Sequence, residues 1–108
     1  MELKRVVVTG LGAVTPLGLT ATETWQNVLK GVSGAAPITH FDTSPFKTKF
    51  ACEVKGFDPL QYFDRKEARK MDLYTQYALV AAKEALEHSG LDLETVNKDE
   101  VGVIFASG

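Results

Sequence analysis

The sequence has 108 residues, of which 44% are hydrophobic and 24% charged, and its formal net charge is -2. These values are typical of one small globular domain and give no support to nucleic-acid binding or to attachment at an anionic membrane surface. The apolar runs are shorter than the roughly 18 residues of a membrane-spanning helix, and MELKRVVV lacks the features of a secretory signal. Since Cys52 is the single cysteine, no internal disulfide can form, and we expect a cytoplasmic protein.

The first predicted element is a strand over residues 4–9, because three consecutive β-branched valines are typical of a strand buried on both faces. The segment that follows, within RVVVTGLGAVTPLG at residues 5–18, is rich in glycine. A dinucleotide-binding turn needs G-x-G-x-x-G, but the third position here is Thr15, and Pro16 has no N–H to offer a phosphate. No Gly-Lys-Ser/Thr follows, as a Walker loop would require. We therefore interpret the glycines as a structural turn, made by Gly10, Gly12 and Gly18.

A helix is predicted over residues 21–30. Thr20 and Glu23 have the spacing of a capping box, and Gly31 is a typical residue just past a helix end. Residues 31–48 contain prolines, glycines and small polar residues, which predicts a loop. Alternation over residues 50–54 predicts a short strand, with Phe50, Cys52 and Val54 on its better-buried face.

The next predicted element is a long helix that ends at Gly90, and either Asp64 or Asp72 could cap its start. An apolar strand over residues 101–108 follows. The order strand, helix, strand, helix, strand predicts an α/β sheet with at least one right-handed crossover. Because the sequence stops directly after an apolar strand, we expect it to be the front of a longer protein.

Four residues are candidates for chemistry outside the glycine-rich turn. Cys52 has no histidine nearby in sequence to activate its thiol, so we expect it to be packed in the interior. His40 and His88 have no second ligand at metal spacing, so no metal site is predicted. Ser107 is not in a nucleophile elbow, because Phe105 stands where that motif needs glycine.

The segment DRKEARKMD, residues 64–72, concentrates positive charge in an otherwise acidic chain. Its basic residues are Arg65, Lys66, Arg69 and Lys70. On a helix, Lys66 and Lys70 would share one face with Arg69 beside them. Two interpretations remain open from charge alone: a solvated polar surface, or a docking site for an acidic partner.

Several stretches together resemble one family. RVVVTGLGAVTPLG, HFDTSPFKTKFACEVKGFDP, DRKEARKMDLYTQYALVAAKEAL and VGVIFASG are similar to the N-terminal portion of the β-ketoacyl-acyl-carrier-protein synthases, in order and along essentially all 108 residues. The HFDTS and RKEARKMD stretches resemble synthase II more than synthase I. The resemblance implies a thiolase-like α/β fold that is incomplete here, with residues 1–108 forming the N-terminal portion of a ketoacyl synthase domain.

The resemblance also implies an activity. Such enzymes extend acyl-carrier-protein thioesters with malonyl carrier by decarboxylative Claisen condensation, in fatty-acid elongation of bacteria. They need no redox cofactor or nucleotide, and usually act as cytoplasmic homodimers. The nucleophilic cysteine, two histidines and a lysine of the family lie beyond residue 108, so no catalytic role passes to Cys52, His40 or His88, and this segment alone is expected to be inactive. Gly108 would stand at the edge of the acyl pocket.

One binding role follows from the resemblance. The family's basic patch for the acidic acyl carrier protein corresponds to Lys66, Arg69 and Lys70, whereas Arg65 corresponds less closely. Two rival interpretations remain. One is a polyketide ketosynthase, which would share the opening motif. The other is a non-catalytic α/β module that only docks an acidic partner through residues 65–70.

Overall fold

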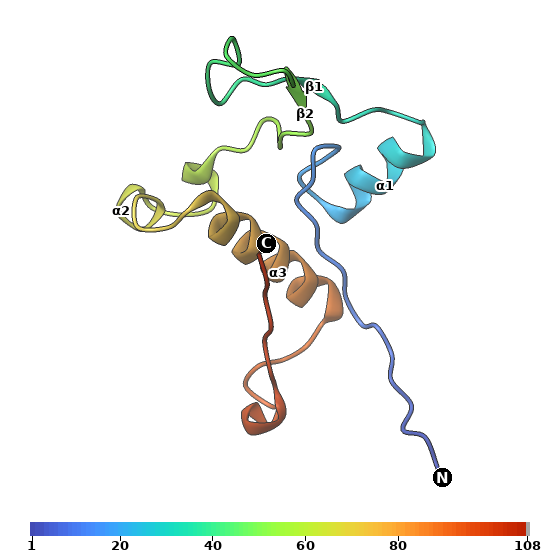
Figure 1. Cartoon of the computed structure of the whole chain (residues 1–108). Coiled ribbons are helices and arrows are strands. Elements are labelled where there is room, and N and C mark those ends of the chain that lie inside the picture. The colour runs from blue at the N-terminus through green and yellow to red at the C-terminus, as the bar shows by residue number, and fades with distance from the viewer. Residues whose placement is uncertain (108) are drawn as a thin grey trace.

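The computed structural model describes residues 1–107, and its elements surround one long helix (Figure 1). The helices are α1 (Ala21–Leu29), α2 (Arg65–Ala68) and α3 (Leu73–Ser89), with short 3-10 turns η1 (Pro59–Gln61) and η2 (Lys98–Glu100). The strands are β1 (Ala36–Pro37) and β2 (Phe50–Ala51). Helix α3 lies in the centre of the molecule, with α1 on one side and α2 beyond its N-terminal end.

Helix α1 forms where the capping signals predict it. The Thr20 hydroxyl accepts a hydrogen bond from the Glu23 N–H at 3.1 Å, and the Glu23 carboxylate accepts one from the Leu19 N–H at 3.0 Å. The helix ends at Leu29, and Gly31 follows with φ of +69°, a conformation that glycine adopts without strain. The predicted helix over residues 21–30 is thus confirmed to within one residue.

The two candidate caps of the second helical region both begin a helix. Asp64 caps the four-residue α2, and its carboxylate accepts a hydrogen bond from the Glu67 N–H at 2.8 Å. Asp72 is the N-cap of α3, without a side-chain cap bond. Gly90 ends α3 with φ of +67°, as its position after the apolar pattern indicates.

The sheet of residues 1–107 is a short antiparallel hairpin that consists of β1 and β2. Ala36 pairs with Ala51, and Pro37 pairs with Phe50. The Lys55 ammonium group joins this hairpin to the rest of the chain, because it donates to the Gly34 carbonyl at 2.8 Å and the Pro16 carbonyl at 3.5 Å. Three polar donors from Thr39 and His40 surround the Glu53 carboxylate.

Two acid–base groups beside the hairpin have shifted pKa values. Burial raises the pKa of Glu53, but the hydrogen bonds from Thr39 and His40 outweigh this effect, so its pKa lies below the ordinary value. Burial, and then the negative charge of Glu53, raise the pKa of Tyr77. Tyr77 belongs to an aromatic group with Phe57, whose ring centroid lies 4.9 Å away, and Phe57 also stacks on Tyr62 at 5.3 Å.

The predicted strands over residues 4–9 and 101–108 are absent as strands from the part of the chain that the structure describes. Residues 4–9 and 101–107 are without regular secondary structure, and neither segment is paired in a ladder. A strand needs a neighbour to satisfy its N–H and C=O groups, and residues 1–107 offer these two segments none. The predicted right-handed crossover is also wrong for residues 1–107, since their sheet is the two-stranded hairpin of β1 and β2.

The expected burial in the second strand is wrong for Phe50 and Cys52, whereas Val54 is partly buried. Phe50 is 64% exposed and Cys52 is exposed, whereas Ala51 and Glu53 are partly buried. The hydrogen bonds that Glu53 accepts from Thr39 and His40 hold this charged side chain toward the hairpin, so its neighbour Cys52 lies on the opposite, solvent side.

Glycine allows the segment before α1 to approach α3 closely. A Cβ atom on Gly12 would lie 1.9 Å from the Ala81 carbonyl oxygen, and one on Gly10 would lie 2.1 Å from the Ala85 carbonyl oxygen. The tight turn itself comes later, where the Thr15 N–H donates to the Gly18 carbonyl at 2.8 Å and Gly18 donates back at 3.2 Å. Gly10 and Gly12 therefore serve packing against α3 more than turning.

The molecule leaves a large area uncovered. It exposes 8974 Å², whereas a compact monomer of this length exposes about 6,000 Å². Its radius of gyration of 17.4 Å compares with about 13 Å for a compact domain of the same length. Val80 is the one buried apolar side chain in the core of the described residues, and Val6, Val8 and Ile104 are at least 80% exposed. Exposed apolar side chains of this kind are typical of core positions that a further layer of protein covers.

Candidate functional site

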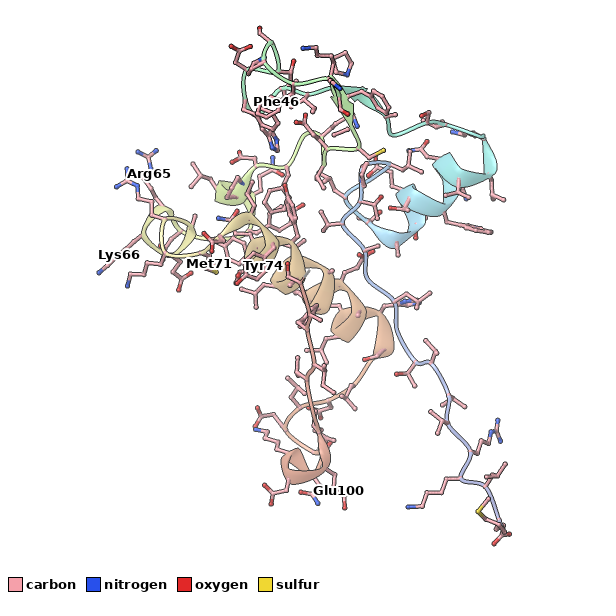
Figure 2. The ribbon with its side chains drawn as sticks, viewed as in Figure 1. Phe46, Arg65, Lys66, Met71, Tyr74 and Glu100 are labelled. Atoms are coloured by element: carbon pink, nitrogen blue, oxygen red, sulfur yellow. The ribbon has the colours of Figure 1, made fainter. Side chains whose placement is uncertain are left out.

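The basic residues of the DRKEARKMD segment gather around α2 at the outer end of the molecule. We call them the basic cluster: Arg65, Lys66, Arg69 and Lys70. All four are exposed, and Figure 2 shows Arg65 and Lys66 pointing away from the rest of the chain. The ion pairs found within residues 1–107 are His40–Glu53 and Lys83–Glu87, so the cluster's positive charges remain available to a partner.

Side chains of the basic cluster line two different hollows beside α2. The helix ends at Ala68, and the Lys70 N–H bonds to the Glu67 carbonyl at 3.0 Å in the turn that follows. Arg65 and Arg69 line a cleft together with residues of η1, whereas Lys70 lines a separate hollow with Phe63 and other residues. The arginines and Lys70 therefore border different hollows beside α2.

Gln76 fixes the cluster to the body of the molecule. This α3 side chain is 5% exposed, and its Nε2 donates to the Ala68 carbonyl at 3.0 Å and to the Met71 carbonyl at 3.2 Å. Ala68 is the last residue of α2, where a helix leaves carbonyl groups without intrahelical partners, and Met71 lies between α2 and α3. A single buried amide therefore holds the basic helix in place relative to α3.

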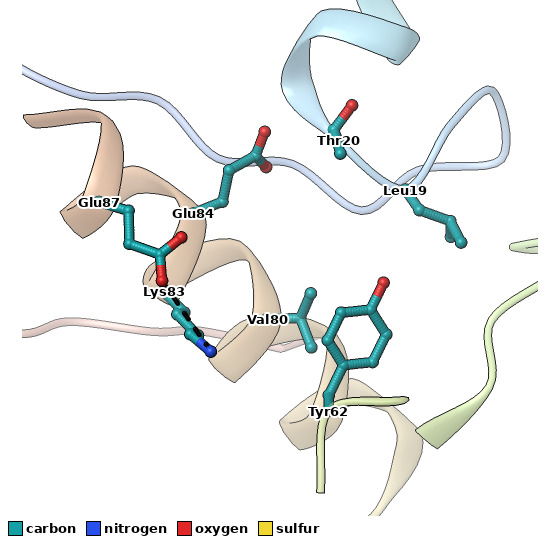
Figure 3. A pocket seen from close by; sticks show the side chains of 7 residues that line it. All are labelled: Leu19, Thr20, Tyr62, Val80, Lys83, Glu84 and Glu87. Carbon is teal, nitrogen blue, oxygen red and sulfur yellow. Dashed lines mark ion pairs between the residues drawn. The ribbon is translucent and has the colours of Figure 1, made fainter. Parts of the chain in front are cut away.

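The glycine-rich segment is not arranged to bind a phosphate. At the start of α1, the Ala21 N–H donates to Glu84 Oε1 at 2.9 Å, and the Ala13 N–H donates to Glu84 Oε2 at 2.9 Å. Figure 3 shows Glu84 pointing from α3 toward this segment. A carboxylate of the chain itself thus occupies the place where a helix N-terminus would bind an external anion.

The remaining candidate residues are dispersed. His40 lies 3.8 Å from the Glu53 carboxylate, while the Nδ1 atom of His88 accepts a hydrogen bond from the Leu11 N–H at 3.0 Å. Cys52 is exposed, so the expectation that it packs in the interior is wrong, and Ser107 is also exposed. Gly108, expected at an acyl pocket, lies outside the described residues.

Residues 1–107 contain no group of three histidine, cysteine or acidic side chains that could hold a metal ion. None of their helices combines the length and the apolar character that crossing a membrane requires.

Sequence reasoning missed the two polar residues that organise this region, Glu84 and Gln76. Both lie in the alanine-rich part of the chain that becomes α3, where a polar residue among small apolar ones is the one available signal. The backbone partners of Glu84 could not be predicted, because Glu84 bonds to Ala13 across 71 residues of sequence, whereas Gln76 bonds to residues 8 and 5 positions before it.

Comparison with known proteins gives consistent matches. Residues 3–108 match the family described as beta-ketoacyl synthase, N-terminal domain. The chain is 49% identical over 108 residues to 3-oxoacyl-[acyl-carrier-protein] synthase 2 of Vibrio cholerae, which covers all of this chain and 26% of the relative. It is 48% identical over 105 residues to the synthase of the same name from Staphylococcus aureus (strain COL), covering 97% of this chain and 25% of the relative. The chain thus spans about a quarter of the length of these relatives.

Solved structures show the same fold. The ishigamide ketosynthase/chain length factor superposes with a TM-score of 0.73 at 36% identity, over 82% of this chain and 22% of that one. A type II polyketide ketosynthase, solved in complex with its acyl-carrier protein, gives 0.65 at 28% identity, over 88% and 23%. A beta-ketoacyl synthase from Burkholderia phymatum gives 0.67 at 29% identity, over 90% and 24%. These neighbours share the thiolase-like fold that the sequence analysis expects.

Proposed function

Because the chain belongs to the β-ketoacyl synthase family, we propose that the protein carrying it is a 3-oxoacyl-acyl-carrier-protein synthase of fatty-acid elongation. The reaction joins the acyl carbon of one carrier thioester to the malonyl group of another, with loss of carbon dioxide. The observation that carries the proposal is the match to synthases of this name along the whole chain, at 49% and 48% identity. We further propose a bacterial cytoplasmic enzyme that forms a homodimer.

Within that enzyme, residues 1–108 would form the N-terminal portion of the synthase domain, with the catalytic residues elsewhere in the protein. The large uncovered apolar surface supports this division, because an exposed area about half again that of a compact monomer calls for a covering layer. Further chain of the same protein would supply that layer. In the same arrangement, Gly108 would border the acyl pocket.

This division predicts that activity needs more than the present chain. The protein at its full natural length, incubated with acyl and malonyl carrier proteins, is expected to form 3-oxoacyl carrier, whereas residues 1–108 alone are expected to form none. Mass spectrometry of the carrier measures the product directly. Product from the 108-residue chain would refute the division, and failure of the full-length protein to condense these substrates would refute the function.

A polyketide ketosynthase is the second candidate, since one structural neighbour is by its name the ketosynthase of a type II polyketide system, and another is a ketosynthase/chain length factor. Their identities of 36% and 28% are lower than the 49% shared with the fatty-acid synthase. The same assay separates the two candidates. A polyketide enzyme would accept 3-oxoacyl carrier for further rounds, whereas an elongation synthase accepts acyl chains that have been fully reduced.

For the chain itself, we propose a docking role for the acyl carrier protein through Lys66, Arg69 and Lys70. The three side chains are exposed, and no ion pair within residues 1–107 neutralises them. The Asp64 cap and the Gln76 amide hold their helix in place. Such a fixed positive surface would steer an acidic partner and orient it.

Charge reversal tests this docking role. Lys66→Glu combined with Arg69→Glu is expected to raise the KM for acyl carrier about tenfold or more at low salt, with a smaller effect on kcat, because the variant repels the acidic carrier. The difference from wild type is expected to shrink as salt shortens the screening length to a few ångströms. Lys98→Glu, a reversal of another lysine far from α2 in sequence, serves as the control and should leave KM unchanged. Equal KM values for wild type and the double variant at low salt would contradict the docking role.

A further inference from the structure

A shallow cleft lies beside the basic cluster, between η1 and α2. We call it the η1–α2 cleft; it has a volume of about 400 Å³, and its walls include Pro59, Leu60, Arg65, Ala68, Arg69 and Gln76. The apolar part consists of Leu60, which is 52% exposed, together with Pro59 and the partly buried Ala68. The two arginines line the same cleft and are exposed.

The walls of the cleft are held by local hydrogen bonds. Asp58, which also lines the cleft, caps η1 by accepting the Leu60 N–H at 3.0 Å. The Phe63 N–H donates to the Pro59 carbonyl at 2.9 Å, which ties the start of η1 to the residues before α2. On the other wall, Gln76 holds the Ala68 carbonyl at 3.0 Å. A cleft with fixed walls loses little conformational freedom when it is filled.

Gln76, which lines the η1–α2 cleft, also has a side-chain oxygen that accepts no hydrogen bond. Its Nε2 donates twice, but its buried Oε1 has no hydrogen-bond partner among the described residues. Buried polar atoms nearly always have a partner, so the unpaired oxygen of this cleft-lining residue indicates a missing donor. An N–H or O–H group that enters the cleft could supply it after a small movement of the amide.

The cleft therefore combines an apolar surface, two exposed cations and an acceptor. We propose that the η1–α2 cleft binds an apolar side chain of the acidic protein that docks on the basic cluster, with Arg65 and Arg69 pairing with carboxylates beside that side chain. A polar hydrogen of the partner then reaches Gln76 Oε1. This inference rests on the proposed docking of a carrier protein. It adds a second, apolar point of contact and assigns Arg65 to the interface together with Arg69.

Charge complementarity determines the class of occupant. Two of the side chains that line the cleft, Arg65 and Arg69, are positively charged, and Asp58, the carboxylate in its wall, already accepts a backbone hydrogen bond. An apolar pocket ringed by polar groups is the usual anchor point in protein interfaces, where the ring excludes water from the central contact. An acidic protein with an apolar residue among its carboxylates fits both features.

The test uses the full-length protein and holo acyl carrier protein as the probe, with the dissociation constant measured at low and high salt. Leu60→Ser removes apolar wall, and Ala68→Leu fills the cleft; each is expected to raise Kd about three- to tenfold at both salt concentrations. Arg65→Gln is expected to raise Kd at low salt and to have little effect at high salt, since charge pairing is screened. Leu91→Ser, a leucine of comparable exposure at 46%, is the matched control and should leave Kd unchanged.

The outcomes separate the two proposals. If Lys66→Glu with Arg69→Glu leaves Kd unchanged, the docking role itself fails. If that double variant weakens binding but Leu60→Ser and Ala68→Leu do not, docking stands and the cleft is not its anchor. Should either cleft variant fold poorly by circular dichroism, the wild-type protein decides: the methyl resonances of Leu60 are expected to shift when carrier is added, and unchanged resonances would overturn the inference.

Discussion

Gly12→Ala is expected to destabilise the protein by about 3 kcal/mol or more, because the new Cβ atom would lie 1.9 Å from the Ala81 carbonyl oxygen. Real Cβ contacts are essentially never below 3.0 Å, so the segment and α3 would have to separate by about 1 Å. The obstacle is backbone and cannot rotate away. That separation would also stretch the hydrogen bond from the adjacent Ala13 N–H to Glu84. Urea unfolding and the yield of folded protein measure the effect.

Gly31→Ala provides the comparison for this prediction. Gly31 needs its positive φ of +69°, but no atom lies within 4 Å of a Cβ built there. Its replacement should cost about 1 kcal/mol, the usual penalty for alanine in a left-handed conformation. Ala81→Gly in the Gly12→Ala background should give no rescue, since the clash involves the main-chain oxygen. Equal costs for the two glycine substitutions would show that space against α3 is not the reason for Gly12.

Glu84→Ala is expected to cost about 2–4 kcal/mol, because two charge-assisted hydrogen bonds disappear together. The carboxylate accepts the Ala13 N–H and the Ala21 N–H, both at 2.9 Å, and so joins α3 to the glycine-rich segment and to α1. The local readout is amide hydrogen exchange. Protection of the Ala13 and Ala21 amides should fall at least about tenfold, which corresponds to the loss of about 1.4 kcal/mol at each site.

Glu87→Gln is the matched control, one turn along the same helix. Glu87 pairs with Lys83 at 3.9 Å, and both side chains are about 70% exposed. Such a surface pair contributes about 0.5 kcal/mol or less, so the control should leave exchange at Ala13 and Ala21 unchanged. Unaltered protection in Glu84→Ala would mean that the carboxylate does not join these segments.

The helices illustrate what can be predicted from sequence. Thr20 with Glu23, and Gly31 after the helix, act within a few residues of the element they delimit, so their effects are readable without a tertiary structure. The same holds for Asp64 and Asp72, where sequence left one start ambiguous and the structure has two helices. The basic cluster was also visible in sequence, because its four charges lie within residues 65–70.

The strands illustrate the opposite case. Val6, Val7 and Val8 have the β propensity of a buried strand, yet a strand is defined by pairing, and residues 1–107 offer these valines no partner. Cys52 has the composition of a core residue but is exposed, because Glu53 beside it turns toward Thr39 and His40. Side-chain type alone could not determine which face of this short strand is covered.

Sequence by itself determined the helices, their ends, the charge around α2 and the family to which the chain belongs. Tertiary structure alone decided the roles of Gly12 and Glu84. Capping and charge are local properties, whereas the contacts of Glu84 span 71 and 63 residues of sequence. The close approach of the Gly12 backbone to α3 and the hydrogen bonds of Glu84 both depend on where distant segments of the chain contact each other. No local sequence pattern predicts those contacts.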